Sequence, residues 1–178
     1  MAKLPGMPRN PPRFCPDCAR PLETRPHGGR DRLSCPDGSC GWVFWDNPLP
    51  VVAALVELEG KVILIQNKGW PESWFGLVTG FLERDETPEA AVLRELKEEL
   101  ALDGEVVRLI GVYDFPMRNE VIVAYHLRAR GTIALGEELA AFKPVDPDKL
   151  RPWPFGTGHA VRDWLAARSA AGGRPAEG

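Results

Sequence analysis

Two hydrophobic runs in the first half of the chain predict a pair of adjacent β-strands. Residues 51–59 and 62–66 are rich in β-branched side chains, and the Glu59-Gly60-Lys61 sequence between them is typical of a hairpin turn. Because both runs are apolar almost throughout, we expect strands that are buried on both faces. Shorter runs at residues 74–79, 106–114 and 120–129 predict three further strands.

A different periodicity predicts an α-helix over residues 89–101. Thr87 can accept hydrogen bonds from the first free amides of this helix, and Pro88 is tolerated in its first turn. We expect Gly104 to end the helix from just beyond its last turn. One side of the helix is apolar and predicts the face that packs on the core, formed by Leu93, Leu96 and Leu100.

The last quarter of the chain predicts one more helix, over residues 157–170, where apolar side chains recur near helical spacing. Residues 132–142 are predicted to form a loop, and residues 145–150 a turn punctuated by Asp-Pro. Strands before and after a central helix, with a second helix at the end, indicate an α/β fold with a helix layer on each face of a mixed sheet.

Length and composition divide the chain into one ordinary domain and a small module, since 178 residues are too few for two full-sized domains. We predict a Pro-rich flexible tail at residues 1–12, a small module at 13–46, the main domain at 47–170 and a second tail at 171–178. A turn sequence, Asp46-Asn47-Pro48, separates the module from the main domain.

The small module contains all 4 cysteines of the chain in two short pairs. Disulfides are one interpretation, but the N-terminus lacks the apolar core of a signal peptide, so we expect a cytoplasmic, reducing environment. Closely spaced cysteines in such an environment more often hold zinc. We therefore predict a zinc ribbon with one structural Zn²⁺, which stabilises a module too small to form a hydrophobic core. The predicted zinc ligands are Cys15, Cys18, Cys35 and Cys40.

The charge balance argues against a nucleic-acid partner. The formal net charge is −3 and the pI is near 5.7, whereas phosphate binding is driven by clustered Lys and Arg. A local basic patch stays compatible with these totals. No stretch reaches the roughly 18 apolar residues of a membrane helix, so we expect no membrane partner.

Three glutamates crowd one face of the helix predicted at residues 89–101. Glu95, Glu98 and Glu99 stand at i, i+3 and i+4, where like charges repel, so we expect cations among them. With their surroundings they resemble the Nudix box: Gly, five residues, Glu, seven residues, then Arg-Glu-apolar-x-Glu-Glu-x-Gly-apolar. The positions in register are Gly80, Glu86, Arg94, Glu95, Leu96, Glu98, Glu99 and Leu102, and Ala101 replaces the last glycine.

The resemblance implies a Nudix-type α/β/α sandwich with a mixed sheet over roughly residues 50–170, preceded by the zinc ribbon. It also implies Mg²⁺ or Mn²⁺ as cofactor, in two or three ions, because hard cations held by carboxylates bridge phosphate oxygens and activate water. The implied metal ligands are Glu95, Glu98, Glu99 and the carbonyl of Gly80. Arg94 is expected to orient neighbouring glutamates, and Glu86 to fix the loop before the helix.

Other candidate residues lie outside the box. Family members often draw a further carboxylate, as base or extra ligand, from a loop about forty residues beyond it, where this chain has Glu137 and Glu138. Glu120 is a more distant candidate, and solvated surface charges are the alternative for all three. The aromatic side chains that could stack a nucleobase, unless they belong to the core, include Tyr113, Phe115, Trp74 and Phe75.

The ribbon-plus-Nudix order is similar to a subgroup with NADH, FAD and ADP-ribose pyrophosphatases. Where NADH pyrophosphatases carry Ser-Gln-Pro-Trp-Pro-Phe-Pro, residues 113–117 are Tyr-Asp-Phe-Pro-Met, and Pro116 is near a proline that recurs in ADP-ribose pyrophosphatases. The expected function is Mg²⁺-dependent cleavage of the diphosphate bridge of ADP-ribose or FAD, with NADH less favoured. The alternatives are a catalytically silent nucleotide sensor whose ribbon binds nucleic acid or a protein, and an enzyme that removes nucleotide caps from RNA. Some relatives complete their sites across a two-fold axis, so the resemblance also suggests a homodimer.

Overall fold

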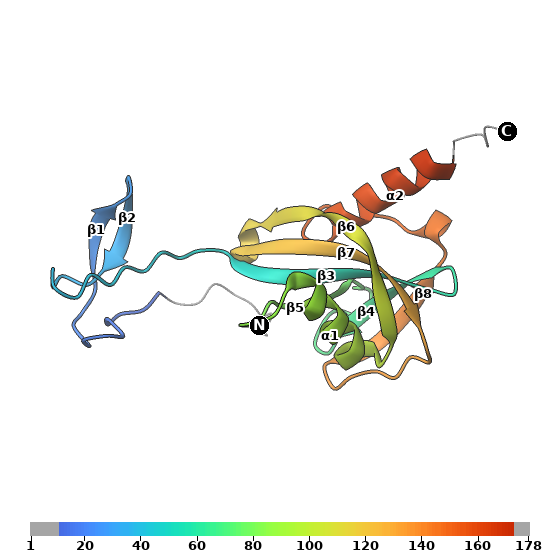
Figure 1. The fold of residues 1–178 in the computed structure, drawn as a ribbon, viewed down its shortest axis with the longest axis horizontal. Helices are drawn as coiled ribbons and strands as arrows, with labels where there is room; N and C mark the ends of the chain where they lie inside the picture. Colours follow the sequence, from blue (N-terminus) through green and yellow to red (C-terminus); the bar gives the residue numbers. More distant parts are fainter. Residues whose placement is uncertain (1–10, 173–178) are drawn as a thin grey trace. The chain divides into compact units, whose positions relative to one another are not determined.

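The computed structural model describes residues 11–172, which form two compact units that divide between Pro48 and Leu49 (Figure 1). Most of the two predicted tails, residues 1–10 and 173–178, lies outside the described residues. Each unit has its own internal structure. Within residues 11–172, no helix is both long and apolar enough to cross a membrane.

The first unit is built on a two-stranded antiparallel hairpin, β1 (Glu23–His27) and β2 (Arg30–Ser34). Gly28 and Gly29 form its turn with φ of 58° and 77°, the left-handed conformation that a tight hairpin turn requires and that glycine adopts without strain. An isolated bridge between Ser34 and Val43 attaches the segment after the hairpin to the end of β2, and a second bridge, between Phe14 and Pro21, lies within the segment before it.

The second unit contains one six-stranded sheet and two helices. Its central hairpin, between β3 and β4, confirms the prediction for residues 51–66, and Glu59 and Gly60 form the turn with positive φ. The elements in chain order are β3 (Leu49–Leu58), β4 (Lys61–Asn67), β5 (Val78–Phe81), α1 (Pro88–Leu100), β6 (Asp103–Phe115), β7 (Glu120–Arg130), β8 (Leu139–Val145) and α2 (Gly158–Gly172).

The strand order is β6-β7-β3-β4-β8, and β5 pairs with the first half of β3 beside β4. β3 runs parallel to β7 over Leu49–Leu58 and antiparallel to its other neighbours, so the sheet is mixed. Residues 51–56 of β3 are buried on both faces, as expected from their continuous apolarity.

Each face of the sheet carries one hydrophobic cluster and one helix (Figure 1). Alternate residues of β3 point to opposite faces: Val52, Ala54 and Val56 pack under α1, whereas Val51, Ala53 and Leu55 pack under α2. From α1 the first cluster receives Leu96 and Leu100, and from α2 the second receives Val161 and Trp164. This confirms the three-layer α/β/α sandwich.

Three predictions about elements are wrong. The strand predicted at residues 74–79 is β5, which begins only at Val78. β8 (Leu139–Val145) occupies part of the segment predicted to be a loop, because pairing with β4 at the sheet edge outweighs a weak local strand pattern that includes Pro144. Helix α1 is not ended by Gly104, which lies in β6. The terminating residue is Ala101, whose φ of 57° and ψ of 18° are left-handed, and whose N–H donates to the Lys97 carbonyl.

Candidate active site and cysteine cluster

Helix α1 carries the predicted catalytic glutamates and packs on the face of the sheet that includes Val52, Ala54 and Val56. Thr87 begins the helix as predicted, since its hydroxyl accepts from the Ala90 amide at 3.2 Å and Pro88 occupies the first turn. Burial of Leu96 and Leu100 against the sheet fixes the rotation of the helix about its axis. The glutamates are thereby placed along one side of α1, at different depths.

Gly80, in β5, lies directly beneath the carboxylate of Glu95. A Cβ atom built on Gly80 would be 1.9 Å from both Cδ and Oε1 of Glu95, which is far inside van der Waals contact. Only glycine therefore allows the carboxylate to approach the strand this closely. The first residue of the box and its first helical glutamate are linked by this steric requirement, which sequence spacing alone does not reveal.

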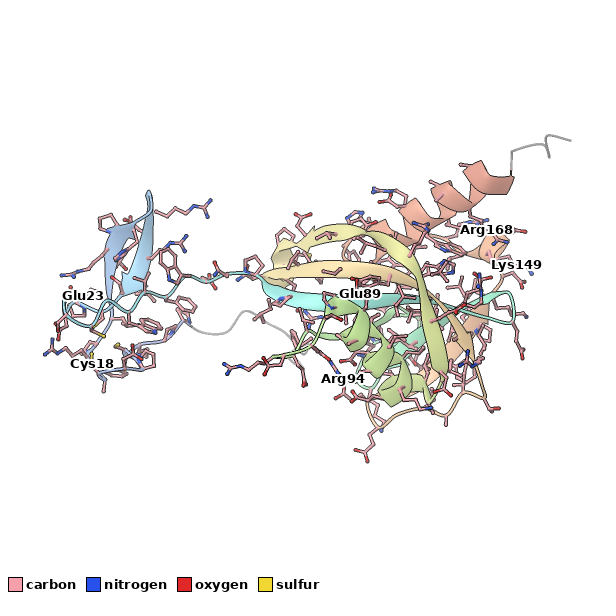
Figure 2. The ribbon with its side chains drawn as sticks, viewed as in Figure 1. Cys18, Glu23, Glu89, Arg94, Lys149 and Arg168 are labelled. Carbon is pink, nitrogen blue, oxygen red and sulfur yellow. The ribbon has the colours of Figure 1, made fainter. Side chains whose placement is uncertain are left out.

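Arg94 extends from α1 and forms hydrogen bonds with several residues of the site (Figure 2). It binds Glu86 bidentately, with Nε and Nη2 donating at 3.2 and 2.8 Å, and Nη2 also donates to the Phe81 carbonyl at 3.1 Å. Its Nη1 donates to Glu95 at 2.7 Å and to Glu98 at 3.1 Å. Arg94 thus holds carboxylates from the loop and from the helix in one network, as expected of an orienting arginine.

Glu86 fixes the loop before α1, as predicted. Besides Arg94 it accepts the Glu83 amide at 2.8 Å. These hydrogen bonds, from Arg94 first and then from the Glu83 amide, lower the pKa of Glu86, so the carboxylate stays ionised.

Glu99 is the most buried member of the glutamate group, with 7% of its surface exposed. Its Oε2 is fully enclosed and has no hydrogen-bond partner among the described residues. Burial raises the pKa of Glu99 to about 8, and the negative charges of Glu95, Glu138 and Glu98 act in the same direction. An unpartnered carboxylate among other carboxylates is unfavourable, so the site has the electrostatic character of a cation site.

The loop that follows β7 brings one of the two predicted loop glutamates to this group. Gly136 donates its N–H to the Glu99 carbonyl at 2.8 Å, and Ala134 donates to the Leu100 carbonyl at 3.0 Å, which satisfies two free carbonyls of the last turn of α1. A Cβ on Gly136 would be 2.4 Å from the Glu98 carbonyl oxygen, so glycine is needed for this contact.

Glu138 follows two residues later, and its carbonyl accepts the Lys68 amide at 2.8 Å. Its charge contributes to the raised pKa of Glu95, after burial as the main cause, as well as to that of Glu99. Glu138 therefore lies within electrostatic reach of the α1 carboxylates. Glu137 and Glu138 are both exposed in this turn, and Glu120 instead pairs with Arg118 at 3.2 Å at the start of β7.

The predicted aromatic residues are not gathered at this site. Phe75, Tyr113 and Phe115 pack into the hydrophobic cluster under α2, on the face of the sheet opposite to α1. The Tyr113 hydroxyl donates to Asp163 of α2 at 2.9 Å, which gives this residue a structural contact. Trp74 is 46% exposed in the loop before β5. A role of these residues in substrate binding stays a prediction, and the exposed side chain of Trp74 is accessible for it.

The carboxylates fit a cation but do not form a closed ligand cage. Glu95 and Glu98 share one nitrogen of Arg94, and 59% of the Glu98 side chain is exposed. Mg²⁺ usually keeps several waters and takes only one or two carboxylates, so an open group suits it. Across residues 11–172, the cysteines of the first unit are the only metal-ligand types gathered closely enough to surround an ion.

The four cysteine sulfurs all lie within 4.8 Å of one another. The nearest pairs, Cys15 with Cys40 at 3.6 Å and Cys18 with Cys35 at 3.5 Å, are too far apart for disulfides, whose sulfurs are about 2.05 Å apart. Four convergent thiols form a set that could bind zinc. Four residues separate Cys35 from Cys40, and Asp37 stabilises this segment. Its carboxylate accepts hydrogen bonds from the amide and hydroxyl of Ser39 at 2.9 and 2.7 Å and pairs with Arg20.

Comparison with known proteins identifies the fold and the family. The family model for the NUDIX domain matches residues 47–165, and the chain belongs to the Nudix family of hydrolases. A crystal structure of a NUDIX hydrolase from Nitrosomonas europaea superposes with a TM-score of 0.76 at 26% identity, covering 92% of this chain and 95% of that one. This share exceeds what the second unit alone can supply, so the likeness extends into the first unit.

Two kinds of curated relatives are similar in sequence. An ADP-ribose pyrophosphatase of Methanocaldococcus jannaschii is 42% identical over 125 residues, which cover 67% of this chain and 74% of that protein. A NAD-capped RNA hydrolase of Mycobacterium tuberculosis is 35% identical over 124 residues, and one of Vibrio atlanticus is 27% identical over 113. The chain spans only 36% and 40% of the lengths of these two proteins.

Proposed function

We propose that the chain hydrolyses the diphosphate linkage of an ADP-containing nucleotide derivative in a reaction that depends on Mg²⁺ or Mn²⁺. ADP-ribose and FAD are the favoured substrates and NADH is less favoured. The names of the relatives support the substrate class, since ADP-ribose and NAD both contain adenosine diphosphate with a diphosphate bridge. The 42% identity to an ADP-ribose pyrophosphatase supports ADP-ribose in particular.

The observation that carries this proposal is the buried, unpartnered carboxylate of Glu99 beside Glu95 and Glu138. A cation would supply the missing partner of Glu99 and offset the repulsion among the three carboxylates. Glu95, Glu98 and Glu99, with the carbonyl of Gly80, would hold the ions. Bound there, divalent ions neutralise phosphate charge and lower the pKa of a coordinated water.

The protein's own residues position this chemistry. Arg94 keeps Glu95 and Glu98 in fixed orientations, and Glu86 in turn holds Arg94 from the loop. Glu138, whose charge contributes to the raised pKa of Glu95 and Glu99, would serve as an extra ligand or as the base that accepts a proton from an attacking water. For ADP-ribose the products would be AMP and ribose 5-phosphate.

A hydrolysis screen tests this function. ADP-ribose, FAD, NADH, NAD⁺, a NAD-capped RNA, diadenosine polyphosphates and nucleoside triphosphates are incubated with the full chain and Mg²⁺ or Mn²⁺, and the phosphate-bearing products are identified. We expect cleavage of ADP-ribose or FAD and none in EDTA. Absence of turnover on all substrates, together with saturable nucleotide binding, would instead support the silent sensor.

Substitution of Glu99 tests the site. Glu99→Gln removes the charge at nearly constant volume, and we expect kcat to fall roughly 10³-fold because a metal ligand is lost. The matched control is Glu105→Gln, an exposed glutamate of β6 paired with Arg128, which should retain wild-type activity. Near-normal turnover by Glu99→Gln would contradict the assignment.

A further inference from the structure

One face of the β1–β2 hairpin gathers four basic residues of the first unit. In the antiparallel register, Arg25 lies opposite Arg32 and His27 lies opposite Arg30. Paired residues of such a ladder project from the same face, so all four side chains share one side of the hairpin. The other side carries Thr24 opposite Leu33 and Pro26 opposite Asp31. The strand alternation thus separates Asp31 from the arginines on either side of it in the sequence.

Within residues 11–172, one ion pair compensates this basic face, and Arg25 and Arg32 also donate to the carbonyls of Pro36 and Trp45. Like-charged residues directly opposite each other destabilise a sheet, so the Arg25 and Arg32 pair is unfavourable for folding alone. The one acidic residue that the register places on this face is Glu23, 3.6 Å from Nε of Arg25. Within residues 11–172, Arg30 forms neither an ion pair nor a side-chain hydrogen bond, and Arg20 is paired with Asp37 outside the hairpin.

An exposed aromatic ring adjoins the basic face. Trp45 is 51% exposed, and the guanidinium of Arg32 lies over its ring at 5.0 Å from the centroid while donating to its carbonyl. Two further aromatic residues close to Trp45 in the sequence, Trp42 and Phe44, stack on each other with ring centroids 6.4 Å apart. Arg30, Arg32, Phe44 and Trp45 line one shallow hollow, whose lining also includes Asp31 and Asp46. Arg32 fixes the Trp45 ring on one side, and half of that side chain remains accessible to solvent.

We propose that this face of the first unit binds single-stranded nucleic acid. Arginines beside an exposed aromatic ring are the arrangement that holds unpaired strands, because the cations follow the phosphate backbone and the ring stacks on a base. A base must be unstacked from its neighbours to reach Trp45, which favours single strands over duplexes. The turn end of the hairpin, with His27 and Arg30, lies away from the strand ends that lead to the cysteines, so thiolate charge does not cancel it.

Binding is measured on the zinc-loaded full chain by fluorescence anisotropy of a 5′-labelled 12-nucleotide oligouridine, without Mg²⁺, at several salt concentrations. Arg30→Ala should weaken binding several-fold. It should also make the slope of the logarithm of the binding constant against the logarithm of the salt concentration shallower by about 0.7, the value for one lost phosphate contact on a single strand. Trp45→Leu should weaken binding on the order of tenfold through lost stacking, with the salt dependence unchanged. Oligothymidine of the same length shows whether the site distinguishes RNA from DNA.

The matched control is Arg130→Ala, which removes an exposed arginine from β7 in the second unit and should bind as the wild type does. Hydrolysis of the small nucleotide substrate should be unchanged in all three variants, so failure of this proposal is separate from failure of the proposed function. Equal metal content and thermal stability show that the variants are folded. The proposal is overturned if oligouridine does not bind at low salt, if Arg30→Ala binds like Arg130→Ala, or if a duplex or an anionic phospholipid vesicle binds as tightly as the single strand.

Discussion

The unit that ends at Pro48 contains one two-stranded hairpin, whereas the unit that begins at Leu49 contains a six-stranded sheet with a helix on each face. Among the described residues, the buried apolar side chains of the first unit are Cys15 and Cys35, and all the others belong to the second. An isolated hairpin is marginal in water, so the two units must be stabilised differently. We expect the first to depend on its cysteine cluster, whereas the second is stabilised by apolar burial on both faces of its sheet.

Functional groups are also presented differently. In the second unit, Gly80 and Gly136 let a carboxylate and a loop approach backbone more closely than any side chain would permit. In the first unit, Arg30 and Trp45 are exposed and Arg32 is partly buried against Trp45, and their placement depends on strand alternation in one hairpin. Substitutions at the carboxylate site of the second unit should therefore alter catalysis with the fold intact, whereas loss of a bound metal should abolish the structure of the first unit.

If the four cysteines hold zinc as predicted, its removal should have the largest effect, because it should unfold the first unit and leave the second folded. Structural zinc contributes about 10–16 kcal/mol at neutral pH in small zinc domains, more than a hairpin of this size can replace. After chelation, amide hydrogen exchange should become fast in β1 and β2 and stay slow in β3 and β7. Cys35→Ser should reproduce this result. Persistent protection of β1 and β2 in metal-free protein would show that the hairpin does not need the cysteine cluster.

Gly80→Ala should disable the site of the second unit and leave both folds intact. The added methyl would occupy the position of the Glu95 carboxylate, 1.9 Å away, and must displace it. A shift of about 1 Å in a catalytic group can reduce turnover about 10²-fold, and this is the loss we expect in kcat. Gly76→Ala is the control, because its Cβ would meet the Trp70 ring at an ordinary 3.4 Å. Equal activity of the two variants would contradict the steric link between Gly80 and Glu95.

The two loop glutamates offer a matched pair for the next effect. Glu138→Gln should lower kcat by about 10- to 100-fold, the range for residues that support a metal site, because Glu138 acts on the Glu95 and Glu99 charges. Glu137→Gln makes the same chemical change at the adjacent residue and should change kcat less than twofold. Steady-state kinetics with a Mg²⁺ titration measures both. If the two variants behave alike, or if Glu137→Gln is the weaker enzyme, the loop does not place Glu138 as we infer.

The sequence predicted the parts of this molecule that follow from local spacing. The hairpin at Glu59-Gly60-Lys61, the start of α1 at Thr87 and the bidentate pairing of Arg94 follow from turn chemistry, capping and the box. The burial of Glu99 and the contact of Gly136 with α1 could not be predicted, because both depend on a loop that returns from beyond β7. The strand β8 was missed for the same reason, since β4 supplies its hydrogen bonds.

Net charge was a poor guide to the surface of the first unit. The formal charge of −3 averages the whole chain, whereas the register of β1 and β2 collects Arg25, Arg30 and Arg32 on one side of a hairpin. That grouping could have been found by applying strand alternation to residues 23–34 with the Gly28-Gly29 turn as the centre. A total charge therefore limits the average surface potential and leaves local patches undetermined.

The smallest expected effect concerns Ala101, the one position where the chain departs from the box. The left-handed conformation of this residue costs an alanine about 1–2 kcal/mol that glycine avoids, whereas glycine loses about 0.4–1 kcal/mol through its freer unfolded chain. Ala101→Gly should therefore stabilise the second unit by about 0.5–1 kcal/mol and raise its midpoint of thermal unfolding by about 2 °C. Calorimetry of the full chain measures this shift.

The same substitution in the right-handed part of α1 should have the opposite sign. Ala90→Gly, also at an exposed position, should destabilise by about 0.5–1 kcal/mol because glycine is unfavourable inside a helix. Neither change touches the carboxylates, so kcat should stay at the wild-type value in both. If Ala101→Gly lowers kcat, the helix end and its contact with residues 134–136 control the position of Glu99, and the site of the second unit is less rigid than its packing indicates.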